Sequence, residues 1–164
     1  MTASAQPRTV EIWGNVGAAR VGGDEGWNGG GIIYGGGVAV PVTRRLAVEA
    51  DVARVKVDRF GPSTHTLISP ALVWRWGSER MYGFAGGGIG MEGTRSTGVL
   101  TIRDENHNPT FQTIESTIFN ATLQGRGGVV FSPNNRTIFR LEAFTSFQYV
   151  LPTAGVKAGA GYRF

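Results

Sequence analysis

The sequence predicts an all-β fold, an eight-stranded antiparallel up-and-down transmembrane β-barrel. One observation is composition: 26 of the 164 residues are glycine, and glycine inside a helix costs about 1 kcal/mol relative to alanine. The second is that apolar and polar residues alternate with a period of two through most of the chain, the pattern of strands with one apolar face. Only 17% of residues are charged and there is no cysteine, which excludes disulfide frameworks and thiolate zinc sites.

A membrane-spanning helix is not expected. The longest stretches without a charged residue, 26–43 and 60–74, are interrupted by repeated glycines or by Pro62 and Pro70, whereas a spanning helix needs roughly 20 predominantly apolar residues. A barrel strand instead hides its apolar residues at every second position. Near-neutral mean hydropathy is therefore compatible with a membrane barrel.

The first half of the chain contains four expected strands. They cover residues 9–21, 32–40, 46–53 and 65–76, joined by a glycine-rich loop at 23–29, a tight turn at 41–45 and a loop near 60–62. In the third strand, Val48 and Val52 lie on one face, and Glu49 and Asp51 lie on the other. This alternation predicts one apolar and one polar face.

The second half repeats the scheme. Four more strands are expected at 81–92, 119–129, 139–147 and 154–164, with turns at 77–80 and 132–135. The glycines of 81–92 leave open which of its residues point inward. The segment from Gly93 to Thr117 is polar and partly β-prone, and we expect it to be a long exposed loop.

Short connections after the second, fourth and sixth strands, with longer or more polar ones after the others, are typical of a barrel with both termini on one side. About eight strands of nine or more residues can cross a bilayer at a tilt. Aromatic residues flank the short turns and predict a belt at one membrane interface. They are Trp74, Trp76, Tyr82, Phe84, Phe131, Phe139, Tyr162 and Phe164.

The polar strand faces carry balanced charge. The acids are Glu11, Glu49, Asp51 and Glu142, and the bases are Arg75, Arg126, Arg140 and Lys157. Such a set suits a narrow barrel interior, because buried charges must be paired. The alternative is a soluble barrel whose polar face is solvated. It is disfavoured because the chain has only two lysines, Lys56 and Lys157.

Glycine has a place in this interior. Five glycines fall on the expected inner face, where they leave volume for long side chains: Gly35, Gly37, Gly155, Gly159 and Gly161. Three others, Gly36, Gly125 and Gly127, fall on the outer face and have no explanation in the pattern.

The C-terminal segment 159–164 has aromatics at alternate positions and ends in phenylalanine. It resembles the C-terminal signature of bacterial outer-membrane barrels, and residues 8–164 resemble a single small barrel of the OmpA/OmpX type. The resemblance implies the bacterial outer membrane, both termini in the periplasm, and Tyr162 and Phe164 as a signal for the barrel-assembly machinery. Residues 1–7 are then the remnant of a signal-peptide junction, since Ala3-Ser4-Ala5 fits the small-residue pattern before a cleavage site.

A further set of cations lies beyond the apolar run of the third strand. Arg54, Lys56 and Arg59 would reach the outer headgroups, where lipopolysaccharide phosphates accept charge-assisted hydrogen bonds. Lipid bilayer and lipopolysaccharide are therefore the expected partners of a monomeric protein. Nucleic acid is not expected, because the arginines are scattered.

No catalytic residue, metal or cofactor is expected. His65, Ser69 and Glu92 could imitate the His/Ser/Glu set of lipid A deacylases, but in those enzymes the histidine and serine are adjacent. Gly88 to Gly93 matches a dinucleotide motif without the helix that such a site needs. His107, with Asp104 and Glu105 in an expected loop, is too sparse for a cation site.

The sequence thus predicts a structural or surface-interaction protein, adhesion-like, with a closed and charge-paired interior and with residues 93–117 facing outward. Two alternatives stay open. One is a small outer-membrane channel, and the other is a soluble lipocalin-like ligand-binding barrel.

Overall fold

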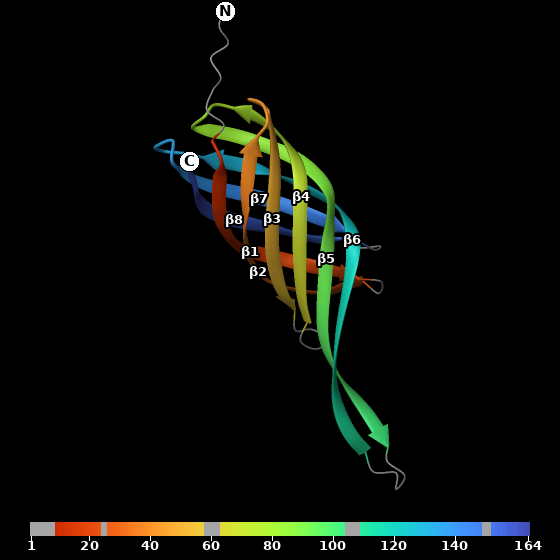
Figure 1. Ribbon diagram of the computed structural model, residues 1–164. Helices are drawn as coiled ribbons and strands as arrows, with labels where there is room; N and C mark the ends of the chain where they lie inside the picture. Colours follow the sequence, from red (N-terminus) through yellow and green to blue (C-terminus); the bar gives the residue numbers. More distant parts are fainter. Residues whose placement is uncertain (1–8, 24–25, 58–62, 104–108, 149–151) are drawn as a thin grey trace, which may run out of the picture.

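The computed structural model describes residues 9–23, 26–57, 63–103, 109–148 and 152–164. The strands are β1 Glu11–Gly23, β2 Gly26–Pro41, β3 Leu46–Val57, β4 Ser63–Gly77, β5 Met81–Arg103, β6 Pro109–Phe131, β7 Thr137–Phe147 and β8 Thr153–Arg163. Each pairs antiparallel with the next, and β8 pairs with β1 to close the barrel (Figure 1). The predicted fold class, a transmembrane-type up-and-down barrel of eight strands, is confirmed.

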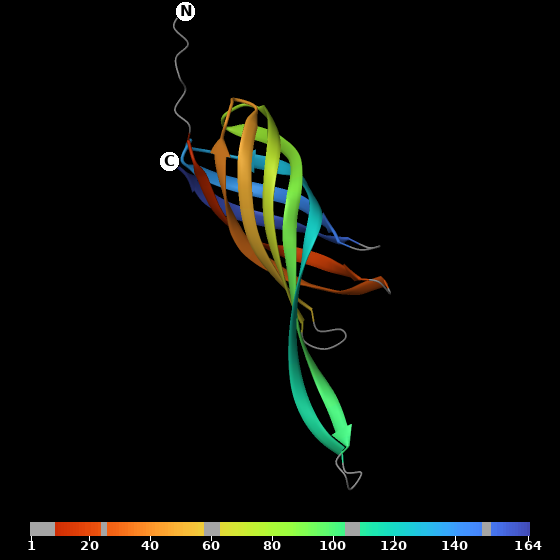
Figure 2. The ribbon, with the colours of Figure 1, turned by 45° about the vertical axis from the view of Figure 1, so that its right-hand side comes forward.

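The barrel has two unlike ends. The C-terminus lies at the same end as the beginning of β1 and the three turns 42–45, 78–80 and 132–136, which we call the turn end (Figure 1). At the opposite end β5 and β6 project as a pair well beyond the other strands (Figure 2). We call this the hairpin end.

The turns are set by local chemistry. Asn135 has φ 63°, a left-handed conformation that asparagine tolerates. The side-chain oxygen of Asn134 accepts hydrogen bonds from the backbone N–H groups of Arg136 and Thr137, at 3.1 and 2.6 Å. Gly77 has φ 121°, and a Cβ there would lie 2.6 Å from the Met81 carbonyl oxygen. These turns therefore need the residues that the sequence provides.

The prediction that residues 93–117 form a loop is wrong. β5 continues to Arg103 and β6 begins at Pro109, with an unbroken register that pairs Gly93 with Phe119 and Thr101 with Phe111. The physical reason is strand propensity: the segment is rich in Thr, Val, Ile and Phe, which favour extended backbone, and it has few turn-forming residues before position 104. What projects is a β-hairpin, not an irregular loop.

The expected rhythm of short and long connections is also wrong. β2 begins at Gly26, so most of the loop expected at 23–29 is strand, and the connections at the two ends are of similar length. Gly29 pairs with Val21 and Trp27 with Gly22, because a polar, glycine-rich sequence can extend a ladder outside the apolar zone. The asymmetry of the molecule lies in strand length.

The structure fixes the side-chain direction in β5 and corrects the aromatic belt. Tyr82 and Phe84 are buried inside the barrel, as is Glu92. The other six predicted belt residues are about half exposed on the outer wall: Trp74, Trp76, Phe131, Phe139, Tyr162 and Phe164. Tyr82 and Phe84 lie next to a turn, but this position does not decide which face they occupy. Successive side chains of a strand point to opposite faces, and these two point inward.

The barrel wall is mostly apolar outside, and the acids of its strands point inside. In β3, Glu49 and Asp51 are buried, whereas Val48 and Val52 are each 49% exposed. The same alternation runs through β4, where Leu72 and Trp74 face outward and Arg75 faces inward. Among the described residues no helix is long and apolar enough to cross a membrane.

Candidate functional site: the barrel interior

Apolar clusters occupy both ends of the interior. At the turn end a cluster contains Trp13, Ala39, Ala71, Val73, Tyr82, Phe84, Val130 and Ile138. Toward the hairpin end a second contains Ala19, Val21, Ile33, Ala53, Val55, Val57 and Leu67, with Phe144 packed against it. The charged side chains described below lie among and between these clusters, so water has little access to them.

Glu11 anchors the charges nearest the turn end. One carboxylate oxygen accepts hydrogen bonds from the Tyr82 hydroxyl at 2.7 Å and from Arg75 Nη2 at 2.9 Å. The other accepts from Arg163 Nε and Nη2, at 3.0 and 2.7 Å. These contacts join β1, β4, β5 and β8, so the carboxylate ties together strands on different sides of the barrel.

Glu49 is the centre of the network. It is 0% exposed and accepts hydrogen bonds from Arg140 Nη1 and Nη2, at 3.2 and 2.7 Å, and from Arg75 Nη2 at 3.2 Å. Arg126 Nη1 approaches it at 3.8 Å. Three guanidinium groups therefore share one buried carboxylate, which makes its charge essential to their burial.

Arg140 also shows how glycine makes room for charge. Its guanidinium carbon lies 3.8 Å from the centre of the Phe84 ring and 4.4 Å from that of Trp13, within cation–π range. The Trp13 ring in turn lies against Gly37, where a Cβ would come within 2.6 Å of Trp13 Cζ2. A larger residue at Gly37 would displace the ring that supports Arg140.

Lys157 closes the middle of the network. Its ammonium contacts Asp51 Oδ1 at 2.7 Å and Glu142 Oε1 at 3.2 Å. Asp51 also accepts a hydrogen bond from the Asn15 side-chain amide at 2.9 Å, and Glu142 accepts one from Arg140 Nε at 2.8 Å. Both carboxylates thus have a cation and a second donor, as buried charges require.

A separate polar cluster lies nearer the hairpin end. Glu92 is 1% exposed and contacts His65 Nδ1 at 3.0 Å, with the hydroxyls of Thr153 and Ser146 donating at 3.2 and 3.4 Å. Ser69 lies on the same strand as His65, but the contact described for it is its carbonyl oxygen, which accepts from Arg126 Nη2 at 2.9 Å. The side-chain contacts described for His65 are to Glu92 and, at 3.2 Å, to the Thr94 hydroxyl.

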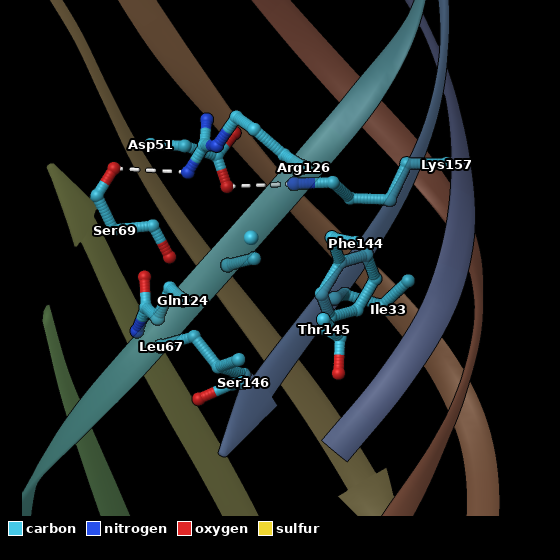
Figure 3. A pocket seen from close by; sticks show the side chains of 12 residues that line it. Ile33, Asp51, Leu67, Ser69, Gln124, Arg126, Phe144, Thr145, Ser146 and Lys157 are labelled. Atoms are coloured by element: carbon cyan, nitrogen blue, oxygen red, sulfur yellow. Dashed lines mark hydrogen bonds and ion pairs between the residues drawn. The ribbon is translucent and has the colours of Figure 1, made fainter. Parts of the chain in front are cut away.

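Little space remains between these groups. A cavity of about 10 Å³ lies among Asp51, Ser69, Gln124, Arg126 and Lys157. Figure 3 shows the side chains that line it. Its volume is near the minimum that one water molecule needs. This cavity therefore offers no room for a small-molecule ligand of ordinary size.

The structure brings all eight predicted interior residues together: Glu11, Glu49, Asp51, Arg75, Arg126, Arg140, Glu142 and Lys157 are buried and ion-paired. Sequence reasoning missed two charged members, Arg163 and Glu92, which raise the described interior to five carboxylates and five Lys or Arg side chains. Arg163 shares the parity of Lys157, so the signal was present. Glu92 was hidden by the unresolved parity of its strand.

The other predicted residues lie apart from the interior. Arg54 and Lys56 are exposed on the outer face of β3, and Arg59 lies outside the described residues. The rings of Tyr162 and Phe164 meet edge-on at 5.0 Å between centroids on the outer face. The segment with His107, Asp104 and Glu105 and the expected cleavage remnant 1–7 also lie outside the described residues. In the described ranges, no group of three or more His, Asp or Glu side chains could hold a metal ion.

Comparison with known proteins supports the fold. No protein-family model matches the chain, and no curated protein matches its sequence. Among solved structures, Neisserial surface protein A superposes with a TM-score of 0.72 at 12% identity, covering 94% of this chain and 97% of that one. Ail, the attachment invasion locus protein of Yersinia pestis, crystallised with the heparin analogue sucrose octasulfate, gives 0.68 at 14% identity, covering 97% and 100%. The N-terminal barrel domain of Pseudomonas aeruginosa OprF gives 0.61 at 11% identity, covering 96% and 98%.

Proposed function

From the transmembrane barrel fold that this chain shares with small outer-membrane proteins, we propose a bacterial outer-membrane barrel with an adhesion-like surface role. The barrel itself is closed and non-catalytic, and the β5–β6 hairpin is the element that meets a partner. The observation that carries this proposal is the hairpin, which continues beyond every other strand (Figure 2).

The hairpin offers an unpaired and partly apolar surface. β4 accompanies β5 only as far as Ser96, and β7 accompanies β6 only from Leu123 onward. Beyond these points no described strand pairs with either edge, a feature that proteins usually cover or blunt. Val99 and Phe111 are 66% and 70% exposed there, and exposed apolar groups gathered on one element mark interaction sites.

The wall and the interior support the membrane placement. The outward side chains of the closed barrel are mostly apolar, and five carboxylates and five Lys or Arg side chains lie inside. The filled interior disfavours the channel alternative, since a cavity of about 10 Å³ passes no hydrated ion. The apolar outer surface disfavours the soluble barrel, in which that face would meet water. We place the turn end, with both termini, in the periplasm and the hairpin outside.

The names of two structurally similar proteins support a role at the cell surface. Ail is named for attachment and invasion, and Neisserial surface protein A for its place at the cell surface. The partners we propose are the bilayer, lipopolysaccharide and, during biogenesis, the barrel-assembly machinery, with Tyr162 and Phe164 as its signal. The barrel would act as a monomer.

Shortening the hairpin tests the surface role. Replacing residues 97–115 by Asn-Gly joins Ser96 to Ser116, which face each other in the register, through a two-residue turn suited to hairpins. We expect this variant to fold and to lose adhesion. The measurement counts non-adherent bacteria that express each form and bind to an epithelial monolayer.

The variant should keep the compact migration before boiling that marks a folded barrel on a detergent gel. Adhesion should fall to the level of the empty vector. Equal adhesion of full-length and shortened forms, or no adhesion by either, would contradict the surface role.

Lipopolysaccharide would contact the outer face of β3. Arg54 and Lys56 follow the apolar run that ends at Val52 and point outward, at the hairpin end, where the outer headgroups lie in the proposed orientation. Basic side chains near an anionic membrane surface contribute about 1 kcal/mol each. Replacing Arg54, Lys56 and Arg59 by glutamine should weaken lipopolysaccharide binding by at least about tenfold.

The binding of the refolded barrel to lipopolysaccharide measures this effect. The matched control is Arg44→Gln with Arg45→Gln, because these exposed arginines lie at the turn end. Unchanged affinity of the triple variant, or equal losses in both variants, would overturn the contact.

A further inference from the structure

An apolar hollow lies on the outer wall near the turn end. Its volume is about 310 Å³, and it is lined by outward residues of β5 to β8, namely Met81, Val129, Phe131, Phe139, Leu141 and Ala158, with Val130, Arg140 and Gly159 completing its wall. Phe131 and Phe139 face each other across β6 and β7, and Leu141 pairs with Ala158. Large side chains thus surround the small side chain of Ala158, which we take as the floor of the hollow.

Two exposed arginines lie close in sequence to residues that line this hollow. Arg80 directly precedes Met81 at the start of β5, and Arg136 directly precedes β7, which carries Phe139. The two turns are tied together, because the Ser132 N–H donates to the Arg80 carbonyl oxygen at 2.7 Å. The Arg163 N–H donates to the Arg136 carbonyl oxygen at 2.6 Å, which fixes the second turn to β8.

The charge of this rim is one-sided. Each of the three turns carries arginine, at Arg44 and Arg45, at Arg80 and at Arg136, and the acid in the same described turns is Glu79. Among the exposed arginines of the described turns, Arg80 and Arg136 lie next to the starts of β5 and β7, two of the strands that line the hollow. A ligand that satisfies both features has an anionic head and a long apolar tail.

We propose that this hollow is a binding site for an anionic phospholipid of the periplasmic leaflet. One acyl chain lies in the hollow against Ala158, between Phe131 and Phe139, and the phosphate accepts hydrogen bonds from Arg80 and Arg136. The height fits, because the half-exposed Trp76, Phe131 and Phe139 mark the interface at this end. Basic pockets on a membrane protein's surface bind anionic lipid headgroups by the same chemistry. The site rests on the proposed membrane placement.

Native mass spectrometry of the refolded barrel tests the site, with phosphatidylglycerol and phosphatidylcholine offered in equal amounts. We expect wild type to retain phosphatidylglycerol about 30-fold more tightly, which corresponds to about 1 kcal/mol for each of two arginines. Arg80→Gln with Arg136→Gln should bring the two lipids to equal retention. Arg44→Gln with Arg45→Gln removes the same charge from the rim away from the hollow and should keep the preference.

A second variant separates the acyl chain from the headgroup. Ala158→Phe fills the floor of the hollow on the lipid-facing wall and should reduce retention of both lipids by tenfold or more. Ala158→Leu takes its place if the phenylalanine variant does not refold. Compact migration before boiling shows that each variant is a folded barrel. Accessibility of a spin label on the outer wall to oxygen and to a nickel chelate tests the membrane placement separately from lipid binding.

Several results would overturn the site. These are equal affinity of wild type for the two lipids, loss of the preference in the Arg44 and Arg45 control, and unchanged retention when the hollow is filled. A dimer that Ala158→Phe abolishes would assign the hollow to a second copy of the chain instead.

Discussion

Replacing Glu49 by glutamine is expected to lower the free energy of unfolding by about 3–5 kcal/mol, the range observed when one partner of a buried ion pair is removed. Glu49 is fully buried and pairs with Arg75 and Arg140, while Arg126 lies 3.8 Å away. Glutamine keeps the shape and one acceptor oxygen but removes the charge. Three guanidinium groups then remain in a water-poor interior with too little negative charge.

Urea titration of the barrel in lipid vesicles, followed by tryptophan fluorescence, measures the loss. The matched control is Glu115→Gln, which also removes a carboxylate paired with arginine. Arg95 and Glu115 form that pair on the hairpin, with side chains 62% and 55% exposed, and exposed pairs contribute at most about 1 kcal/mol. Similar losses in the two variants would mean that burial does not set the importance of the Glu49 carboxylate.

Placing arginine at Leu72 is expected to destabilise the barrel by about 2–4 kcal/mol in a bilayer, the cost of a cation on the lipid face near the midplane. Leu72 faces outward in the middle of β4 and is 53% exposed. In a soluble barrel the same position would face water, and surface substitutions there usually change stability by less than about 0.5 kcal/mol. The stability of this one variant therefore shows whether position 72 faces lipid or water.

Val99→Arg provides the control for Leu72→Arg. Val99 is equally apolar and 66% exposed, but it lies on the hairpin beyond the barrel. Its substitution should change the unfolding free energy by less than about 0.5 kcal/mol in the same vesicles. If both variants were equally stable, the outer wall would not be in contact with lipid.

Strand number, faces and the core of the charge network could be predicted from the sequence, because a period of two fixes which side chains share a face. Glu49, Asp51 and Lys157 could therefore be placed inside without coordinates. The pairing itself could not be predicted, since Glu49 and Arg140 are 91 residues apart and meet only because the barrel closes. Periodicity gives a face but not a neighbour across the barrel.

The direction of the β5 side chains and the hairpin could not be predicted from the alternation of apolar and polar residues. Glycines in 81–92 carry no side-chain information, so the inward direction of Tyr82, Phe84 and Glu92 was lost. The hairpin was mistaken for a loop because a polar strand outside a membrane has no need of an apolar face. The outward Gly125 and Gly127 stay without a role, although a Cβ at Gly125 would meet only the Thr145 methyl, at 3.5 Å.

Spin-label accessibility on the outer wall tests the central claim most directly, namely that the apolar face of a closed barrel lies in lipid. The chain has no cysteine, so a label can be attached at one introduced cysteine at a time: Val52, Leu72 or Leu141 on the wall and Val99 on the hairpin. In vesicles, the account predicts that wall labels are relaxed by oxygen, which partitions into lipid, and shielded from a water-soluble nickel chelate, while the Val99 label shows the reverse. Wall labels that the nickel chelate relaxes as strongly as the Val99 label would contradict it.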